Sequence, residues 1–526
     1  MGRPIRDGAR GEPLRMRLAR HALTGILAAV AGIAAGHLVA AVVDPAASPV
    51  LAIGSTVIDL TPTPVKEWAV ARFGTADKAV LEGSVLAVTL AAAAVAGVLS
   101  RRRPWLGAAL LAALVVLAGA AAASRPMAEP IDLLPAVVAL LVGVATLLGL
   151  GRLAGRSASE PRARRDPSAE AGPAAYAGRR GFVLGAAGVT VAAALAGLAG
   201  QVRSGAQSAR RLALPRPAQP APALPAGLER TVPGISPLQT PTARFYRVDT
   251  NLVVPPVDVD RWTLSVDGMV ERPFSLTFAE LAAMPLIERD ITLTCVSNEV
   301  GGGYVGAARW LGVRLTDVLG RAGVRGRPDQ VLSTAVDGFT ISTPLAAIRD
   351  GRDAMIAIGM NGAQLTDVHG FPARLVTPGL YGFVGATKWL TRLTLTTYAA
   401  EQAYWTRRQW ATEAPIKTSA RIDTPAPLST IRAGRTAIGG VAWAQHRGIG
   451  TVEVRIDGGP WQPARLGPDI GVDSWRQWYL PWDAAPGLHR LSVRAIDLRG
   501  NPQPTERATP FPNGSSGIQE VVVTIE

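Results

Sequence analysis

Long apolar stretches in the first 202 residues constrain this chain more than any other feature. A bilayer is crossed by about 20 apolar residues, and the buried helices of soluble domains rarely keep such a run for so long. The sequence therefore predicts a five-helix transmembrane region over residues 1–202. Its spans are predicted at His21–Val43, Ala79–Leu99, Trp105–Ala123, Ile131–Gly151 and Gly181–Val202.

Basic residues alternate with these stretches. Arginines precede the first span, Arg101–Arg103 separate the second from the third, and Arg179-Arg180 precede the fifth. The loops Asp44–Lys78 and Ser124–Pro130 carry at least as many acids as bases. This is the positive-inside pattern, so we expect a multi-pass protein of the cell membrane with everything after Val202 on the extracytoplasmic side. The pattern also accounts for the net charge of +14 without a nucleic-acid partner.

Three further regions follow from composition. Residues 203–230 form a proline-rich linker. Residues 231–415 mix short β-type runs, such as Arg261–Gly268 and Leu390–Tyr398, with helical pieces, which predicts an α+β domain. Residues 416–526 alternate with period two and contain the hairpin signal Asp457-Gly458-Gly459, which predicts an all-β immunoglobulin-like sandwich.

The chain has one cysteine, Cys295, so no disulfide can form within it. A free thiol outside the cytoplasm is a liability because oxidising compartments attack exposed thiols. The sequence therefore hints that this thiol is capped by a ligand.

Several segments resemble the sulfite-oxidase family of molybdopterin enzymes, over about Thr231–Glu526. TLTCVSNEVGG is similar to the segment that carries the family's molybdenum-ligating cysteine, and the stretch around HGFPAR is similar to its cofactor-holding segment. The resembling segments are Phe245–Gly268 (as an opening strand), Thr292–Gly302, Ala307–Leu319 and Met360–Leu390.

This resemblance implies a molybdenum–molybdopterin cofactor and names its ligands. A soft thiolate suits molybdenum, and Cys295 would supply it as metal ligand and catalytic residue. The resemblance implies Asn298 and Tyr304 as the other two catalytic residues, at the substrate mouth. The pterin phosphate requires basic groups and N–H donors. The residues implied as cofactor-binding are Tyr246, Arg247, Arg309, His369, Arg374, Thr387 and Lys388.

The chain departs from the family around the substrate pocket. Val300, with Glu299 beside it, stands where sulfite-oxidising relatives have an arginine, and Asp249 stands where they have another. Acidic groups at the mouth would repel a sulfite dianion, so we expect a substrate other than sulfite. The family's active-site tyrosine has no secure equivalent, since Tyr398 and Tyr404 only flank its place and Gln402 is the candidate for the place itself.

The family's cytochrome domain has no counterpart here, so we expect a separate electron-transfer partner, a cytochrome or a quinone-linked protein. The predicted spans offer only His37, with His21 at the edge of the same segment, whereas a bis-histidine haem needs two inward-facing imidazoles. No haem is therefore expected within this chain, and contact with quinone stays open. The resemblance also allows a homodimer through the C-terminal domain.

Arg179-Arg180, Phe182 and the mild apolar segment after them resemble a twin-arginine export signal. Molybdopterin enzymes of this kind receive their cofactor in the cytoplasm, and the twin-arginine route carries folded cargo. The sequence thus predicts that the last domain crosses already folded, although arginines before any span also satisfy positive-inside retention. Cleavage at Leu195–Gly200 stays open, and an uncut anchor is preferred.

Together these features predict a membrane-anchored molybdopterin oxidoreductase that catalyses two-electron oxygen-atom transfer on a small substrate. Reduction of an S-oxide or N-oxide and oxidation of a substrate both stay open. The alternative is a tethered binding or structural module of the same fold without metal. A hydrolase is disfavoured because the chain has no G-x-S-x-G or H-E-x-x-H motif, and a transporter would need more spans and intramembrane charges.

Overall fold

The computed structural model describes residues 14–73, 76–125, 128–156 and 212–526, with the single positions 184, 187, 188, 190 and 191. The chain divides into two compact units. One is Met1–Arg210 with Thr250–Pro256, and the other is Arg211–Asp249 with Val257–Glu526. The fifth predicted span, 181–202, lies outside the described residues except for those single positions.

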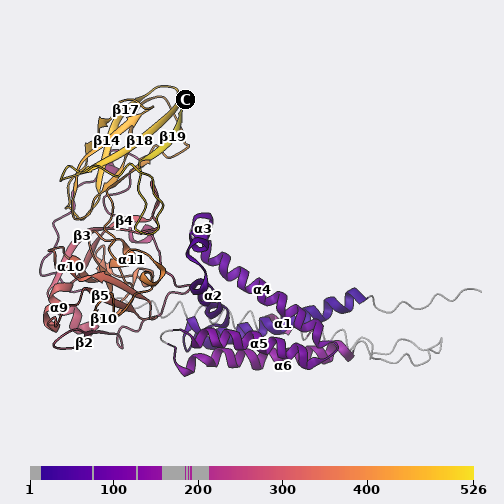
Figure 1. Cartoon of the computed structure of the whole chain (residues 1–526). Coiled ribbons are helices and arrows are strands. Elements are labelled where there is room, and N and C mark those ends of the chain that lie inside the picture. Colours follow the sequence, from indigo (N-terminus) through magenta and orange to yellow (C-terminus); the bar gives the residue numbers. More distant parts are fainter. Residues whose placement is uncertain are drawn as a thin grey trace, which may run out of the picture. The chain divides into compact units, whose positions relative to one another are not determined.

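Four long apolar helices dominate the first unit, and α1 packs against α4 and α6 while α5 also packs against both (Figure 1). All four are long and apolar enough to cross a membrane, and they lie where the first four spans are predicted. Close approach depends on small residues, since a Cβ on Gly25 would lie 1.9 Å from Ala93 O. The helices are α1 (Leu14–Ala40), α4 (Asp77–Ser100), α5 (Pro104–Ala123) and α6 (Leu134–Arg156).

The segment predicted as a loop between the first two spans contains two more helices, α2 (Pro49–Leu60) and α3 (Thr63–Phe73). α2 is apolar, and its Ala52 packs against Ala121 and Ala122 of α5. Twelve residues of helix rise about 18 Å, well short of a bilayer core, so a search for long spans passes over such a helix.

Residues 257–396 of the second unit form two sheets with short helices at their edges. One sheet has the order β2-β1-β10-β5-β6, and the other has β3-β4-β7-β8 with β9 also paired to β7. The predicted β-type runs Arg261–Gly268 and Leu390–Tyr398 form strands with shorter bounds, β1 and β10. The strands are β1 (Thr263–Gly268), β2 (Phe274–Thr277), β3 (Leu286–Thr294), β4 (Val305–Arg314), β5 (Gln330–Ala335), β6 (Thr340–Pro344), β7 (Met355–Met360), β8 (Ala363–Gln364), β9 (Arg374–Val376) and β10 (Leu390–Thr396). The helices are α8 (Phe278–Ala282), α9 (Leu315–Ala322), α10 (Leu345–Arg349) and α11 (Gly382–Gly385).

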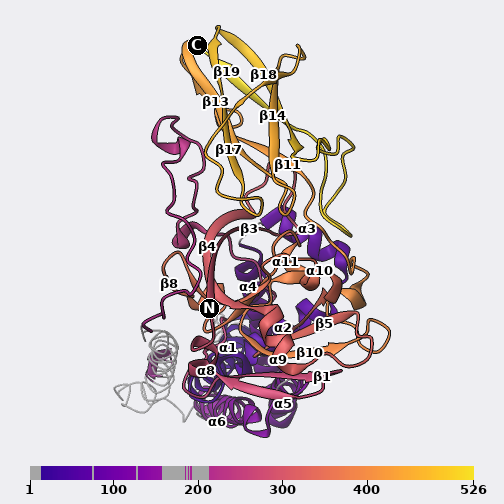
Figure 2. The same ribbon diagram turned by 90° about the vertical axis from the view of Figure 1, so that its left-hand side faces the viewer.

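The C-terminal part is built from two β-sheets, of order β11-β13-β17-β16 and β12-β19-β18-β14-β15 (Figure 2). Ile438 and Trp478 from the first sheet share one buried core with Val452, Leu491 and Val523 from the second. The immunoglobulin-like topology stays a prediction. The strands are β11 (Ser419–Thr424), β12 (Thr430–Ile431), β13 (Gly434–Trp443), β14 (Ile449–Ile456), β15 (Gln462–Pro463), β16 (Arg465–Leu466), β17 (Arg476–Ala484), β18 (Gly487–Asp497) and β19 (Gln519–Ile525).

Apart from Thr250–Pro256, the two predicted domains 231–415 and 416–526 lie in the same compact unit. A buried cluster joins them, with Val296 and Tyr381 from the first and Trp443 and Trp475 from the second. Val296 directly follows Cys295, so the C-terminal part packs beside the predicted metal ligand.

The proline-rich linker is not a free spacer in its described part, residues 212–230. Gln219 pairs with β3, where its carbonyl accepts from Glu288 N at 2.9 Å. Farther along, Leu228 N donates to Gln477 Oε1 on β17 at 2.8 Å. Proline content predicts an extended backbone but not the surface along which it lies.

Candidate active site

Cys295 directly follows β3, at the start of the loop that leads into β4. Its backbone N donates to Tyr304 O at 2.9 Å, which closes the loop. Inside the loop, Asn298 N donates to Cys295 O at 3.0 Å, and Asn298 Oδ1 accepts from Tyr304 N at 2.7 Å. The structure thus brings together all three predicted catalytic residues and gives the buried Asn298 side chain a loop-fixing role.

Two residues of the C-terminal part hold this loop from outside. Ser515 Oγ donates to Asn298 O at 2.5 Å, and Arg421 Nη1 donates to Gly302 O at 2.9 Å. The shape of the Cys295 loop therefore depends on both parts of the second unit.

The Cys295 thiol is buried, with 8% of the residue exposed. Burial raises its pKa, so without a metal the sulfur keeps its proton. Two phenols lie near it. Burial raises the pKa of Tyr246, with the Cys295 charge as the next contribution, and burial raises the pKa of Tyr381 to about 12, with a smaller contribution from Cys295. Cys295 therefore lies in a water-poor site beside two protonated hydroxyl groups.

Arg374 is a buried cation, with 5% of the residue exposed. Its Nη1 donates to His369 O and its Nη2 to Ala386 O, both at 3.2 Å, and its Cζ lies 5.1 Å from the centre of the Trp310 ring. Burial lowers its pKa to about 10. Backbone carbonyls and a ring do not neutralise a guanidinium, so this position strongly favours a bound anion.

Two more cations share one carboxylate nearby. Lys388 Nζ lies 2.6 Å from Asp249 Oδ2, and Arg247 Nε lies 2.9 Å from the same oxygen. Burial lowers the pKa of Lys388 to about 8. Asp249 was expected to repel anions at the mouth, but its side chain is only 5% exposed and is held by these two bases. With Arg374, the cluster has more basic than acidic charge.

His369 ends a single 3-10 turn, Asp367–His369, just before β9. Its Nε2 lies 3.1 Å from Thr242 O, and because a carbonyl can only accept, Nε2 carries the proton. Burial lowers its pKa to about 4, so the ring is neutral near pH 7. The next residue must be glycine: Gly370 has φ +104°, and a Cβ there would lie 2.9 Å from Lys388 Cβ.

Arg309 does not belong to this cluster. Its Nη2 lies 2.7 Å from Asp290 Oδ2 and donates to Pro222 O at 2.6 Å. Successive side chains of a strand point to opposite faces of its sheet. Because Trp310, the next residue, faces Arg374, the Arg309 side chain points to the other face. The Arg309 guanidinium is thus paired with Asp290 and the Pro222 carbonyl, and we no longer propose Arg309 as a cofactor ligand.

Thr387 and the segment before β1 also differ from expectation. The Thr387 Oγ1 lies 2.6 Å from Ser333 Oγ, so the Thr387 side chain is bound to β5, although Thr387 directly precedes Lys388 in the chain.

The opening strand predicted over Phe245–Gly268 forms only at Thr263–Gly268, and Tyr246 and Arg247 lie in irregular backbone before it.

The residues present fit a molybdopterin. Its soft metal requires a thiolate, which Cys295 can supply, and its phosphate requires the cations that Arg374, Lys388 and Arg247 present. Binding must displace the thiol proton, because only the deprotonated sulfur is a ligand.

Comparison with known proteins agrees with this site. The family model for the oxidoreductase molybdopterin binding domain matches residues 251–405. Sulfite oxidase of Homo sapiens is 31% identical over 321 residues, which are 50% of this chain and 57% of that protein. Sulfite oxidase of Gallus gallus is 30% identical, with 50% of this chain and 68% of that protein covered. Nitrate reductase [NADH] 1 of Oryza sativa subsp. japonica is 27% identical over 50% of this chain and 36% of its own length.

Among solved structures, the sulfane dehydrogenase SoxCD of Paracoccus pantotrophus aligns with a TM-score of 0.49 and 26% identity, over 55% of this chain and 83% of its own.

The matched domain and the thiol-and-cation site define a molybdopterin-dependent oxidoreductase, an enzyme whose cofactor is molybdenum-molybdopterin. This chain belongs to the sulfite oxidase family of these enzymes. It spans 57% of the length of human sulfite oxidase.

Three residues of the site were missed by sequence reasoning. Tyr381 lies near Cys295, Trp310 lies against Arg374, and Thr242 O accepts from His369. A signal existed for the first two, since both fall inside segments that resemble the family. Nothing in the sequence distinguishes Thr242, because its contribution is a backbone carbonyl.

Proposed function

We propose that this enzyme is anchored in the cell membrane and catalyses two-electron oxygen-atom transfer on a small substrate on the extracytoplasmic side. The observation that carries the proposal is a buried thiol, Cys295, and a buried cation, Arg374, which both influence the Tyr246 phenol, in a chain that also contains four apolar helices of membrane-spanning length.

Each side chain has a proposed role. Cys295 holds the metal, which when bound supplies oxygen-atom transfer and two-electron redox chemistry. Arg374, Lys388 and Arg247 hold the pterin phosphate, and neutral His369 orients the segment that carries Arg374. Tyr246 contributes an O–H at the metal side, and Asn298 shapes the mouth beside Tyr304.

We propose that the substrate is not sulfite. Val300 is half-buried and Glu299 is exposed where sulfite-oxidising relatives are expected to carry arginine. Because Asp249 is already paired with two bases, this argument depends on Val300 and Glu299 alone. A panel of sulfite, S-oxides and N-oxides, tested with an artificial electron carrier on metal-loaded protein, should show turnover with one oxide class and little with sulfite. Efficient sulfite oxidation would refute the substrate assignment.

A separate cytochrome or quinone-linked protein is the proposed electron partner. The two packed sheets of residues 419–525 support an immunoglobulin-like C-terminal domain, which is also the proposed surface for a homodimer.

The proposed route of export predicts the effect of a double substitution. Changing Arg179-Arg180 to Lys-Lys should strand the last domain in the cytoplasm, because the twin-arginine pathway requires the arginine pair while lysine keeps the positive charge. Protease added to spheroplasts should degrade the wild-type domain and leave the variant's domain intact. The change Arg102→Lys, between two earlier helices, is the matched control and should not alter the cleavage. Equal cleavage of wild type and variant would rule out this route.

A further inference from the structure

One loop of the C-terminal part, residues 508–516 between β18 and β19, reaches the candidate active site from outside. Ala508 and Ser516 close its base, because the backbone N of each donates to the carbonyl of the other, at 3.1 and 3.3 Å. Within the loop, Gly514 N donates to Pro510 O at 2.6 Å. The shape of this loop is therefore fixed by its own backbone hydrogen bonds.

Ser515 attaches the 508–516 loop to the Cys295 loop. Its Oγ donates to Asn298 O at 2.5 Å. Asn298 in turn joins the two ends of the Cys295 loop, because its N donates to Cys295 O and its Oδ1 accepts from Tyr304 N. A displacement of Ser515 therefore acts on the backbone that holds the thiol.

Gly514 lies directly against the phenol of Tyr381. It is buried with φ +93°, and a Cβ there would lie 2.5 Å from the Tyr381 Oη. The phenol belongs to the surroundings of the thiol, since Tyr381 shares a buried cluster with Val296, the residue after Cys295. Both the left-handed backbone and the contact with the ring require glycine at position 514.

Two further contacts hold the 508–516 loop in place. Lys417 Nζ donates to Gly514 O at 2.5 Å and to Asn513 Oδ1 at 3.1 Å. Ala411 N, in the molybdopterin-binding part, donates to Pro512 O at 3.2 Å. Gly514 therefore cannot withdraw from the phenol unless the loop loses hydrogen bonds.

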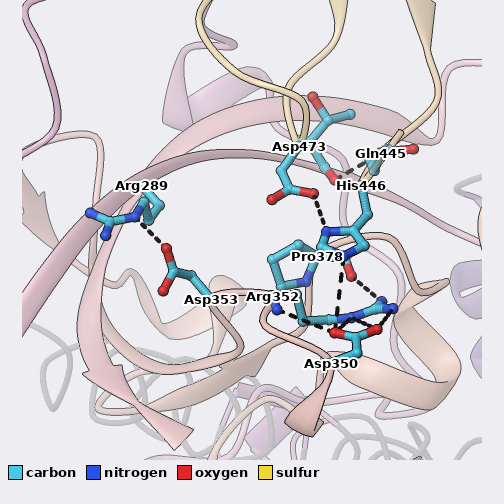
Figure 3. Close-up of polar contacts among 9 residues, drawn as sticks. Arg289, Asp350, Arg352, Asp353, Pro378, Gln445, His446 and Asp473 are labelled. Atoms are coloured by element: carbon cyan, nitrogen blue, oxygen red, sulfur yellow. Dashed lines mark hydrogen bonds and ion pairs between the residues drawn. The ribbon is translucent and has the colours of Figure 1, made fainter. Parts of the chain in front are cut away.

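The backbone that carries Tyr381 is held as well. Figure 3 shows Arg352 beside Pro378, three residues before Tyr381, and Arg352 Nη1 donates to Pro378 O at 2.6 Å. Tyr381 N donates to Ala414 O at 3.0 Å. Because both backbones are held, a side chain added at Gly514 must displace either the ring or the loop.

The strand that leads into the site, β3, is held by other loops of the C-terminal part. Gln445 Nε2 donates to Thr292 O and to Thr294 Oγ1, both at 3.3 Å. Asp473 O accepts from Thr292 N at 2.9 Å. The C-terminal part thus fixes the end of β3, and its 508–516 loop acts on the segment that follows.

We propose that Gly514 and Ser515 are positioning residues of the Cys295 site. Ser515 holds the Cys295 loop, Gly514 leaves room for the Tyr381 phenol beside it, and together they restrict access to the thiol. This effect on the thiol does not depend on bound metal. Its consequence for catalysis, that the 508–516 loop sets the room a substrate finds beside the metal, rests on the proposed function.

The single cysteine allows a direct test, because a thiol reagent reports on this site alone. Full-length protein from molybdate-starved cells is treated in detergent with a neutral maleimide, and the rate of labelling is measured. Gly514→Ala should label about tenfold faster than wild type, because the added methyl displaces the phenol or the loop. Ser515→Ala should label about fivefold faster, since it loses one hydrogen bond to the Cys295 loop. Ser515→Thr keeps the hydroxyl and should restore the wild-type rate.

The C-terminal part offers a matched control for each change. Gly500 has φ +83°, but a Cβ there meets no heavy atom within 4 Å. Ser516 Oγ donates to Glu506 O at 2.8 Å, within the C-terminal part. Gly500→Ala and Ser516→Ala should therefore label at the wild-type rate, even though the strained backbone of Gly500→Ala lowers the unfolding midpoint.

Ser515→Ala decides the question alone if Gly514→Ala does not fold. A wild-type labelling rate in either folded variant would overturn the proposal, and so would an equal acceleration in the matched control. Absence of molybdenum from protein made in molybdate-supplied cells would refute the proposed function and leave the labelling result standing.

Discussion

Replacing Cys295 with serine should abolish turnover, by at least about a thousandfold, which corresponds to roughly 4 kcal/mol in activation free energy. Serine keeps the size of the side chain but offers a hard oxygen in place of a soft thiolate, so the metal loses its only proposed protein ligand. The fold should survive, because a small buried hydroxyl costs only about 1–3 kcal/mol. Steady-state turnover, metal content and the unfolding midpoint should be measured on the same preparation.

Gly303→Ala is the matched control, since it lies in the same loop and an added Cβ there meets no heavy atom within 4 Å. It should keep both turnover and molybdenum. Wild-type turnover in Cys295→Ser, with the metal retained, would show that the thiolate is not the basis of catalysis.

Arg374→Met should separate cofactor binding from stability. The wild-type guanidinium is buried against backbone carbonyls and Trp310, so its removal should leave the unfolding midpoint of cofactor-free protein unchanged or raised. The same change should lower the cofactor content of folded protein by about 10–100-fold, because the phosphate loses a buried charge-assisted partner.

Arg309→Met is the comparison that distinguishes a cofactor ligand from a structural arginine. It leaves Asp290 partly buried without its 2.7 Å partner, so it should lower the free energy of unfolding by roughly 3 kcal/mol. The molybdopterin content of the protein that does fold should stay near wild type. The account would be contradicted if Arg374→Met kept its cofactor, or if Arg309→Met folded normally and lost it.

Much of the fold could be predicted because burial in a membrane or a core requires apolar residues at regular positions in the sequence. Twenty apolar residues in a row mark a membrane-length helix, and α1, α4, α5 and α6 lie where hydropathy placed them. Alternation and turn residues marked β1 and β10, and the single thiol drew attention to Cys295. The family resemblance then supplied His369, Arg374 and Lys388, which the structure brings into one cluster.

The errors have a common physical origin, since they concern which partner a residue meets across the fold. Arg309 carries the right charge, but the alternation of β4 turns it toward Asp290 while Trp310 faces the site. Asp249 was expected to present its charge to solvent, but Lys388, 139 residues later, neutralises it. Gln219 belongs to a proline-rich stretch whose composition says nothing of its pairing with β3.

The C-terminal part shows the same limit. Its strands could be predicted from alternation, but Ser515, Gln445 and Asp473 hold the Cys295 loop and the end of β3 through contacts more than 150 residues apart in the chain. No local sequence pattern predicts such long-range contacts. Through them the C-terminal part positions the residues around Cys295.

Elemental analysis of the folded, full-length protein, purified from cells supplied with molybdate, tests the central claim most directly. We predict close to one molybdenum atom per chain in the wild type and a strongly reduced content in Arg374→Met. A wild-type protein that is folded, exported and free of molybdenum would contradict the assignment of Cys295 as a metal ligand.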